Sequence, residues 1–184
     1  MSYNALVLLG YSGVGKDTIA NLLITDDKRK VNVKFSALTK RLIERAFDYP
    51  TGALEDKQQR VEPLELNREL YELNAMDLLT ALFTSGNSRV EQAGLTYALR
   101  SIKPGQFPVF TDVRRRQEAY AIAYNFNPLV LYLVRDDIFP SVNDSGIHFI
   151  YDCFAKSSIH ATINLVKDKP ELTVETIKLL LGNQ

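Results

Sequence analysis

The sequence predicts an α/β fold with a central parallel sheet of about five strands. Short apolar runs alternate along the chain with stretches in which apolar residues recur every three or four positions, the order expected of strands and crossover helices. The first run, Ala5–Leu9, is apolar on both faces, as in a strand that helices cover from both sides. A glycine-rich loop and a helical pattern follow it directly. Ligands of such folds bind at the carboxyl ends of the strands.

Five segments have the apolar or alternating pattern of strands. The second alternates between apolar and polar residues, and Pro108 lies near the start of the third, where a proline is tolerated. The predicted strands are Ala5–Leu9 and residues 31–35, 107–111, 129–134 and 161–165.

Helical patterns fill most of the intervals between these strands. Ser36 is a candidate cap for the second helix, and Thr173 is expected to cap the closing helix. The predicted inner face of the second helix consists of Leu38, Leu42, Ile43 and Ala46. The other predicted helices span residues 17–23, 65–73, 76–83, 90–100 and 117–124.

Length and composition fit a single globular domain over residues 1–184. The chain is 46% hydrophobic and 24% charged, with 22 basic and 22 acidic side chains. A formal charge of zero gives no general attraction to nucleic acid or to an anionic membrane, so neither is expected as a partner. No apolar run is long enough to span a membrane. One cysteine cannot form an internal disulfide, which favours a reducing, cytoplasmic location.

The loop after the first strand matches the phosphate-binding pattern G-x-x-x-x-G-K. Small residues let successive backbone N–H groups curl around phosphate oxygens, and the start of a helix adds partial positive charge. Lys16 supplies a point charge for the β- and γ-phosphates. The alternative is a glycine-rich turn with an exposed lysine. The predicted ATP-binding residues are Gly10, Gly13, Val14, Gly15, Lys16, Asp17 and Thr18.

Three residues are candidate ligands for Mg²⁺, directly or through water. Asp17 stands where this pattern usually has a serine or threonine hydroxyl that binds the metal, and Thr18 is a second source of that hydroxyl. Asp112 ends an apolar strand, the place of a second metal-binding carboxylate. A helix or turn cap is the alternative role for Asp112.

Arginines follow two of the predicted strands. Residues 114–116 are all arginine, although cations at the start of a helix oppose its dipole. Arg135 follows the next strand, where pairing with Asp136 or Asp137 is an alternative to a catalytic role. Lys16, Arg114 and Arg135 are the catalytic candidates. A structural or surface role is expected for Cys153, His148 and His160.

These features resemble those of the phage-type deoxynucleoside monophosphate kinases. The Gly15-Lys16-Asp17-Thr18 segment looks like the end of their phosphate loop. Thr111-Asp112-Val113-Arg114 with Glu118-Ala119 is similar to their Asp-Val-Arg-x-x-x-Glu-Ala signature. Three more segments agree in order: residues 35–40 with Phe47, Glu55-Asp56-Lys57, and the helix carrying Arg89, Gln92, Gly94 and Arg100.

The resemblance implies a three-layer P-loop NTPase-type domain of the nucleotide-kinase kind. It implies transfer of the γ-phosphoryl group of ATP to a deoxynucleoside 5′-monophosphate, with Mg²⁺ as cofactor and, for a phage protein, in the host cytoplasm. Arg89 is implied at the acceptor phosphate and Gln92 at its base, whereas Arg114 and Arg135 would approach the transferring phosphate or the ATP base. The implied acceptor residues are Lys40, Arg41, Arg89, Gln92, Arg100 and Asp112.

Other functions remain open at this point. The same loop occurs in phosphomevalonate-type kinases, so another small acceptor is the nearest alternative, and a non-catalytic ATP- or GTP-binding module is the next. A GTPase switch is disfavoured because Asp112 is not followed by the required Asp-x-x-Gly element. Residues 49–63, as a mobile acceptor-side segment, and 136–154, as a lid, are the candidates for closure. The oligomeric state is open, with a homodimer as one alternative.

Overall fold

The structure is a computed structural model, and it describes residues 2–61, 75, 78, 88–140 and 160–182. The chain divides into two compact units. Met1–Lys34 with Ser101–Gln184 form the sheet unit, and Phe35–Arg100 form the helical unit. Within the described residues, no helix has the length and apolarity that a membrane span requires.

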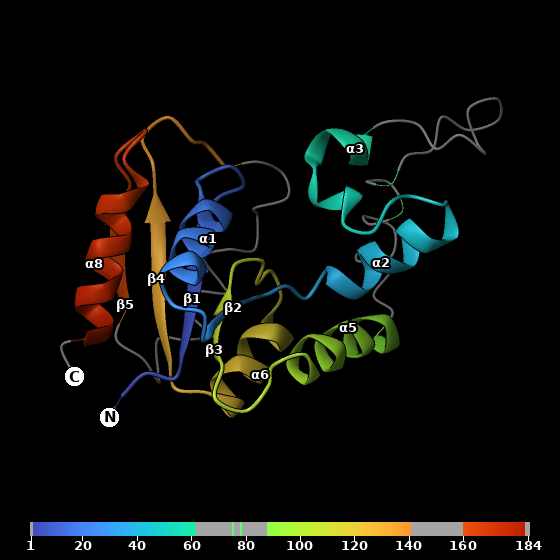
Figure 1. Cartoon of the computed structure of the whole chain (residues 1–184), viewed down its shortest axis with the longest axis horizontal. Coiled ribbons are helices and arrows are strands. Elements are labelled where there is room, and N and C mark those ends of the chain that lie inside the picture. The colour runs from blue at the N-terminus through green and yellow to red at the C-terminus, as the bar shows by residue number, and fades with distance from the viewer. Residues whose placement is uncertain (1, 62–74, 76–77, 79–87, 141–159, 183–184) are drawn as a thin grey trace. The chain divides into compact units, whose positions relative to one another are not determined.

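The sheet unit is built on five parallel strands in the order β2-β3-β1-β4-β5 (Figure 1). The central strand β1 pairs through Leu6 with Val109 on one side and with Leu129 on the other. The loops that follow β1, β3 and β4 therefore begin at neighbouring positions on the same edge of the sheet. The strands are β1 (Ala5–Leu9), β2 (Lys30–Val33), β3 (Phe107–Phe110), β4 (Pro128–Val134) and β5 (His160–Asn164).

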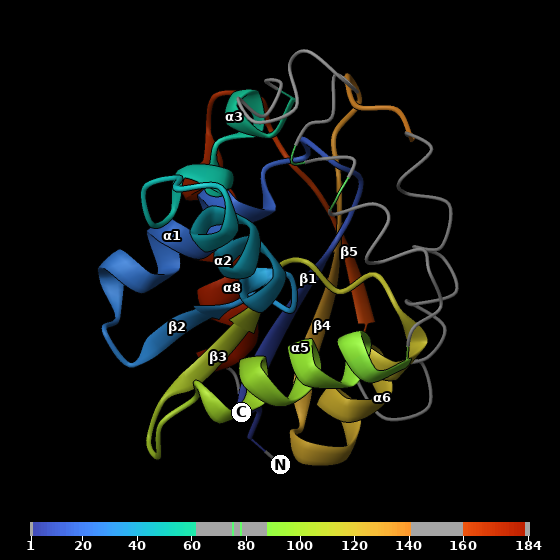
Figure 2. The same cartoon turned by 90° about the vertical axis from the view of Figure 1, so that its right-hand side faces the viewer.

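Helices cover both faces of this sheet. Helices α1 (Lys16–Asp26) and α8 (Pro170–Gly182) pack together on one face, and α6 (Arg116–Asn125) lies on the other (Figure 2). Alternate residues of each strand supply the two faces, which is why β1 is buried along its whole length. The core on the α1–α8 face includes Leu6, Leu8, Ile19, Leu23, Leu131 and Ile177.

The helical unit is described through α2 (Ala37–Ala46), the short 3₁₀ helix η1 (Ala53–Glu55), α3 (Lys57–Val61) and α5 (Ser88–Arg100). Helix α2 packs against α5 and against η1. At Gly94 of α5, a Cβ atom would lie 3.1 Å from the carbonyl oxygen of Phe35. A glycine at this position lets α5 approach the chain just before α2.

The predicted inner face of α2 is confirmed at Ile43, which is buried, and wrong at Leu42 and Ala46, which are exposed, and the helix also buries charged side chains. Leu42 is 58% exposed, whereas the buried residues include Lys40 and Glu44. Lys40 Nζ donates to Glu55 Oε1 at 2.9 Å, and Glu44 Oε1 accepts from the backbone N–H of Leu54 at 3.0 Å. These partners satisfy the buried groups and so make their burial tolerable.

The predicted fold class and all five strands are confirmed, with shifts at their ends. Strand β2 ends at Val33, so that Lys34 lies beyond it. Thr173 is not a cap, because α8 begins at Pro170, whose missing N–H costs nothing at the first helical position. The predicted helix 65–73 lies outside the described residues, as does 76–83 apart from Leu78.

Candidate functional site

The loop between β1 and α1 lies against the backbone of the neighbouring strand. Its glycines at 10, 13 and 15 have φ angles of 142°, 86° and 109°, which side-chain-bearing residues rarely adopt. A Cβ atom on Gly10 would lie only 2.5 Å from the carbonyl oxygen of Leu133 in β4. Gly10 is therefore required for this close approach, and it sets the position at which the rest of the loop turns into α1.

Lys16 places a positive charge over this loop. It is the first residue of α1, and its Nζ donates to the carbonyl oxygens of Gly10 at 2.5 Å and Tyr11 at 2.9 Å. The ammonium group thus lies back across the loop, near the N–H groups at the start of α1 that carry the partial positive charge of the helix. This combination of an ammonium group and a helix N-terminus suits a phosphate-sized anion.

Asp17 joins the loop to the ends of β2 and β3. Its Oδ1 accepts a hydrogen bond from Thr111 Oγ1 at 2.8 Å and lies 3.4 Å from Lys34 Nζ. Burial alone would raise the pKa of Asp17, but the charge of Lys34 and hydrogen bonds from Thr111, Lys34 and Asn32 together hold that pKa below its ordinary value. Asp17 is therefore a carboxylate at neutral pH.

A buried carboxylate shapes the turn between β3 and α6. Glu118 is 9% exposed, and its Oε2 accepts from the backbone N–H groups of Arg114 at 2.8 Å and Arg115 at 3.1 Å. Burial raises the pKa of Glu118 to about 7, assisted by the negative charge of Asp112 and opposed by the two backbone hydrogen bonds and Arg115. Glu118 consequently fixes the turn on which Asp112 and Arg114 stand.

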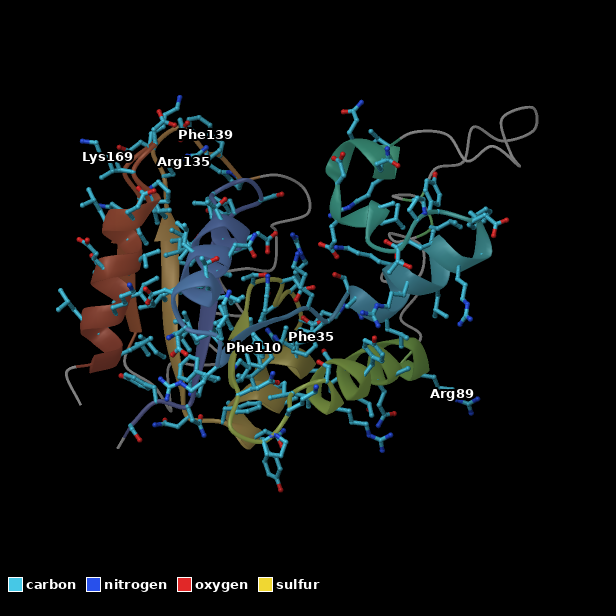
Figure 3. The ribbon with its side chains drawn as sticks, in the orientation of Figure 1. Phe35, Arg89, Phe110, Arg135, Phe139 and Lys169 are labelled. Carbon is cyan, nitrogen blue, oxygen red and sulfur yellow. The ribbon has the colours of Figure 1, made fainter. Side chains whose placement is uncertain are left out.

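The segments after β4 and β5 meet next to the loop. Arg135 Nε donates to Asp137 Oδ1 at 2.5 Å, and Lys167 Nζ lies 3.8 Å from Asp137 Oδ2. Of the two alternative partners of Arg135, Asp136 and Asp137, the structure shows Asp137. The hydrogen bond from Arg135 lowers the pKa of Asp137. Figure 3 shows Arg135, Phe139 and Lys169 at this end of the sheet unit.

The structure thus gathers the predicted ATP, metal and catalytic residues at one edge of the sheet unit. Gly10 to Thr18 follow β1, Asp112 and Arg114 follow β3, and Arg135 follows β4. Thr18 is exposed in the first turn of α1. Among the described residues, no three His, Cys, Asp or Glu side chains form a metal-binding cluster. A Mg²⁺ ion needs only one or two carboxylates when nucleotide phosphates complete its shell.

The helical unit contains an open pocket of about 510 Å³ on one face of α5. Three of the predicted acceptor residues, Arg89, Gln92 and Arg100, line it (Figure 3 shows Arg89 on α5). The residues that complete its lining are Leu38, Ala93, Thr96 and Tyr97.

The other predicted acceptor residues lie elsewhere. Arg41 is linked to the pocket, since its guanidinium group donates to the hydroxyl of Tyr97 and lies 5.6 Å from the centre of that ring. Lys40 is 6% exposed and paired with Glu55, and it does not line the pocket. Asp112 belongs to the sheet unit.

The sequence interpretation missed two sets of residues at these sites. Asn32, Lys34 and Thr111 surround Asp17, and the positions of Lys34 and Thr111 near the carboxyl ends of predicted strands were a usable signal. Thr96 and Tyr97 stand four and five residues after Gln92, and the four-residue spacing places Thr96 next to Gln92 on one face of the helix.

Comparisons with solved structures identify the fold. The chain is similar to shikimate kinase from Bacteroides thetaiotaomicron, at 13% identity and a TM-score of 0.51 over 98% of this chain and 99% of that one. It is equally similar to shikimate kinase from Acinetobacter baumannii in complex with shikimate, at 12% identity and a TM-score of 0.51 over 99% and 95%. No protein-family model matches the chain, and no curated protein matches it in sequence. At such low identity the likeness shows the fold alone.

Replacing Gly10 tests the close approach of the loop to β4. Gly10→Ala should lower the free energy of unfolding by at least about 3 kcal/mol, because it combines an unfavourable φ with a collision against backbone. Gly105→Ala is the matched control, since Gly105 also has a positive φ but nothing lies within 4 Å of its Cβ position. Urea unfolding of both variants gives the comparison. Equal losses would show that the contact with Leu133 has no energetic weight.

Burial of Glu118 predicts a dependence of stability on pH. The folded protein holds the Glu118 proton more tightly than the unfolded chain, so stability should fall as the pH rises from about 5 to about 8, by up to about 3 kcal/mol. The carboxyl groups of Asp17, Asp27 and Asp137 have lowered pKa values and titrate below this interval.

Glu118→Gln should remove this decrease of stability with pH, because the amide side chain does not ionise in this interval. Urea unfolding midpoints measured across the interval would then be flat for the variant and falling for the parent protein. Parallel curves for the two proteins would mean that Glu118 does not titrate there.

Proposed function

We propose that the protein transfers the γ-phosphoryl group of ATP to a deoxynucleoside 5′-monophosphate, giving ADP and the diphosphate. The observation that carries this proposal is the position of Lys16, whose ammonium group lies over the glycine loop at the start of α1. The kinase fold shared with the two shikimate kinases supports phosphoryl transfer as the reaction class. The resemblance of the chain to phage-type deoxynucleoside monophosphate kinases supports the acceptor.

ATP binds to the loop of the sheet unit in this proposal. The backbone N–H groups of Gly13 and Gly15 and the ammonium group of Lys16 bind its phosphates, and Lys16 exchanges the carbonyls of Gly10 and Tyr11 for phosphate oxygens. Asp17, Thr18 and Asp112 hold Mg²⁺, directly or through water, since their oxygens are the donors that this ion prefers. When bound, Mg²⁺ neutralises charge on the phosphate oxygens.

The acceptor binds in the pocket of the helical unit. Arg89 supplies a positive charge for its phosphate, Arg100 adds a positive charge at the other end of α5, and Gln92 offers an amide that both donates and accepts hydrogen bonds to a base. The ring of Tyr97, held by Arg41, is a surface for the sugar or base. Apolar and cationic groups side by side fit a nucleoside monophosphate, which has an aromatic base and a dianionic phosphate.

The chemical step requires no protein nucleophile. An oxygen of the acceptor phosphate attacks the γ-phosphorus of ATP, a bond from that oxygen to phosphorus forms, and the bond to the β–γ bridging oxygen breaks as ADP leaves. Lys16 and Arg114 neutralise the charge on the transferring phosphoryl group, while Arg135 binds at the base of ATP. Water must be excluded so that the γ-phosphoryl group reaches the acceptor only.

Loss of the Lys16 charge should abolish most of the activity. Lys16→Ala is expected to lower kcat by at least about 10²–10³-fold, as for the removal of one electrostatic stabiliser. Lys28→Ala also removes a lysine charge, but from a position just after the C-terminal end of α1, and it should leave kcat unchanged. The assay measures ADP release from Mg-ATP with the four deoxynucleoside monophosphates, AMP, GMP, phosphomevalonate, shikimate and no acceptor.

The acceptor panel tests the substrate class in the same assay. ADP formation that depends on a deoxynucleoside monophosphate supports the proposal. Turnover only with phosphomevalonate or shikimate would make the protein a kinase for another acceptor, and equal rates without any acceptor would make it an ATPase. A folded Lys16→Ala protein with full activity would remove Lys16 from the mechanism.

The pocket assignment predicts how Arg89 affects the two substrates. Arg89→Ala should raise the KM for the acceptor at least about tenfold, the effect of losing about 1.4 kcal/mol of binding, and change the KM for ATP little. Arg45→Ala removes an exposed arginine from α2 in the same unit and serves as the control. An increase confined to the KM for ATP would assign Arg89 to the other substrate.

A further inference from the structure

The phosphate loop carries a negative charge where a hydroxyl is usual. Asp17 follows Lys16 directly in the first turn of α1, and its side chain is 62% exposed. A carboxylate and a phosphate oxygen a few ångströms apart repel each other, and the repulsion is stronger where water screens the two charges poorly. The loop therefore needs a compensating charge if it is to hold a nucleotide.

Lys34 supplies that charge from a neighbouring strand. It is the first residue after β2, and its Nζ lies 3.4 Å from Asp17 Oδ1. Only 19% of the Lys34 side chain is exposed, so its position is much more restricted than that of Asp17. Strand β2 pairs with β3 up to the Val33–Phe110 pair, which places Thr111 beside the same carboxylate.

We propose that Lys34 is a positioning residue that compensates the charge of Asp17 and thereby lets this phosphate loop bind a nucleotide triphosphate. The inference rests on the proposed function to the extent that the loop binds ATP. With Lys34 present, Lys16, Asp17 and Lys34 together carry a single net positive charge. Without Lys34, the Asp17 carboxylate is no longer held by a cation at 3.4 Å, and it can turn toward the triphosphate that Lys16 must attract.

Lys34 also restricts the carboxylate geometrically. Thr111 and Lys34 both bind Oδ1, and Asn32 adds a further hydrogen bond to the carboxylate, so the Asp17 side chain is held in one orientation. The lowered pKa of Asp17 agrees with a carboxylate that is held by a cation and by hydrogen bonds. Lys34 thus acts on the nucleotide through Asp17, and removal of the Asp17 charge should make Lys34 dispensable.

A double-mutant cycle on nucleotide binding tests this dependence. ATP affinity is measured by calorimetry, with EDTA so that no metal contributes, for the parent protein, Lys34→Met, Asp17→Asn and the double variant. Lys34→Met should weaken binding about tenfold, the equivalent of about 1.4 kcal/mol. The double variant should bind within about threefold of Asp17→Asn, because no carboxylate then needs compensation. Lys34→Arg should retain most of the affinity.

Lys30→Met is the matched control. Lys30 begins the same strand, its side chain is 13% exposed, and its Nζ binds Asp27 at 2.8 Å, but it lies at the other end of β2 from the loop. This variant should lose stability without losing ATP affinity. Thermal unfolding of all the variants shows whether each one is folded, and Lys34→Gln replaces Lys34→Met if the latter is not.

Two outcomes would overturn the inference. One is an unchanged affinity in Lys34→Met, and the other is a double variant that binds ATP about tenfold more weakly than Asp17→Asn, which would mean that Lys34 contacts the phosphates itself. Failure of the proposed function has a different signature. ATP binding that follows the predicted cycle, without acceptor-dependent ADP formation, would leave the role of Lys34 in place and reject the kinase reaction.

Discussion

The contact between Gly10 and the backbone of β4 is the constraint on which the rest of the site depends. A Cβ atom at Gly10 would lie 2.5 Å from the Leu133 carbonyl oxygen, so the loop can take this path only with glycine there. The path decides where α1 begins, and hence where Lys16 can reach back to the carbonyls of Gly10 and Tyr11. The nearest side chains to the Cβ positions of the other two loop glycines are Ile138 and Leu165, from the segments after β4 and β5.

Three carboxylates at this edge of the sheet have specific partners that control them. Asp17 is held by Lys34 and Thr111, Glu118 by two backbone N–H groups, and Asp137 by Arg135. An anionic ligand would be repelled by uncompensated carboxylates, and a loose arginine would lose entropy on binding it. The partners thus prepare the edge for a highly charged ligand, with the positive charge of Lys16 at the centre.

The strands and the phosphate loop were predictable because both depend on short-range patterns. An apolar run of five residues, then glycines at 10, 13 and 15, then a lysine, is local information. The charged part of the inner face of α2 was not predictable, because Lys40 and Glu44 are buried only through partners in residues 54–55, a stretch without helical periodicity. The role of Lys34 was also not predicted, because it depends on β2 and α1 lying side by side, which short-range sequence patterns do not show.

In the proposed function, ATP binds to the glycine loop of the sheet unit and the acceptor binds to the α5 pocket of the helical unit. Backbone amide shifts of isotope-labelled protein, titrated separately with ATP and with a deoxynucleoside monophosphate, distinguish the two sites. We expect ATP to shift the amides of Gly13, Gly15 and Lys16, and the monophosphate to shift those of Gln92, Thr96 and Tyr97. Shifts of one common set of amides by both ligands, or no shift of the loop with ATP, would contradict it.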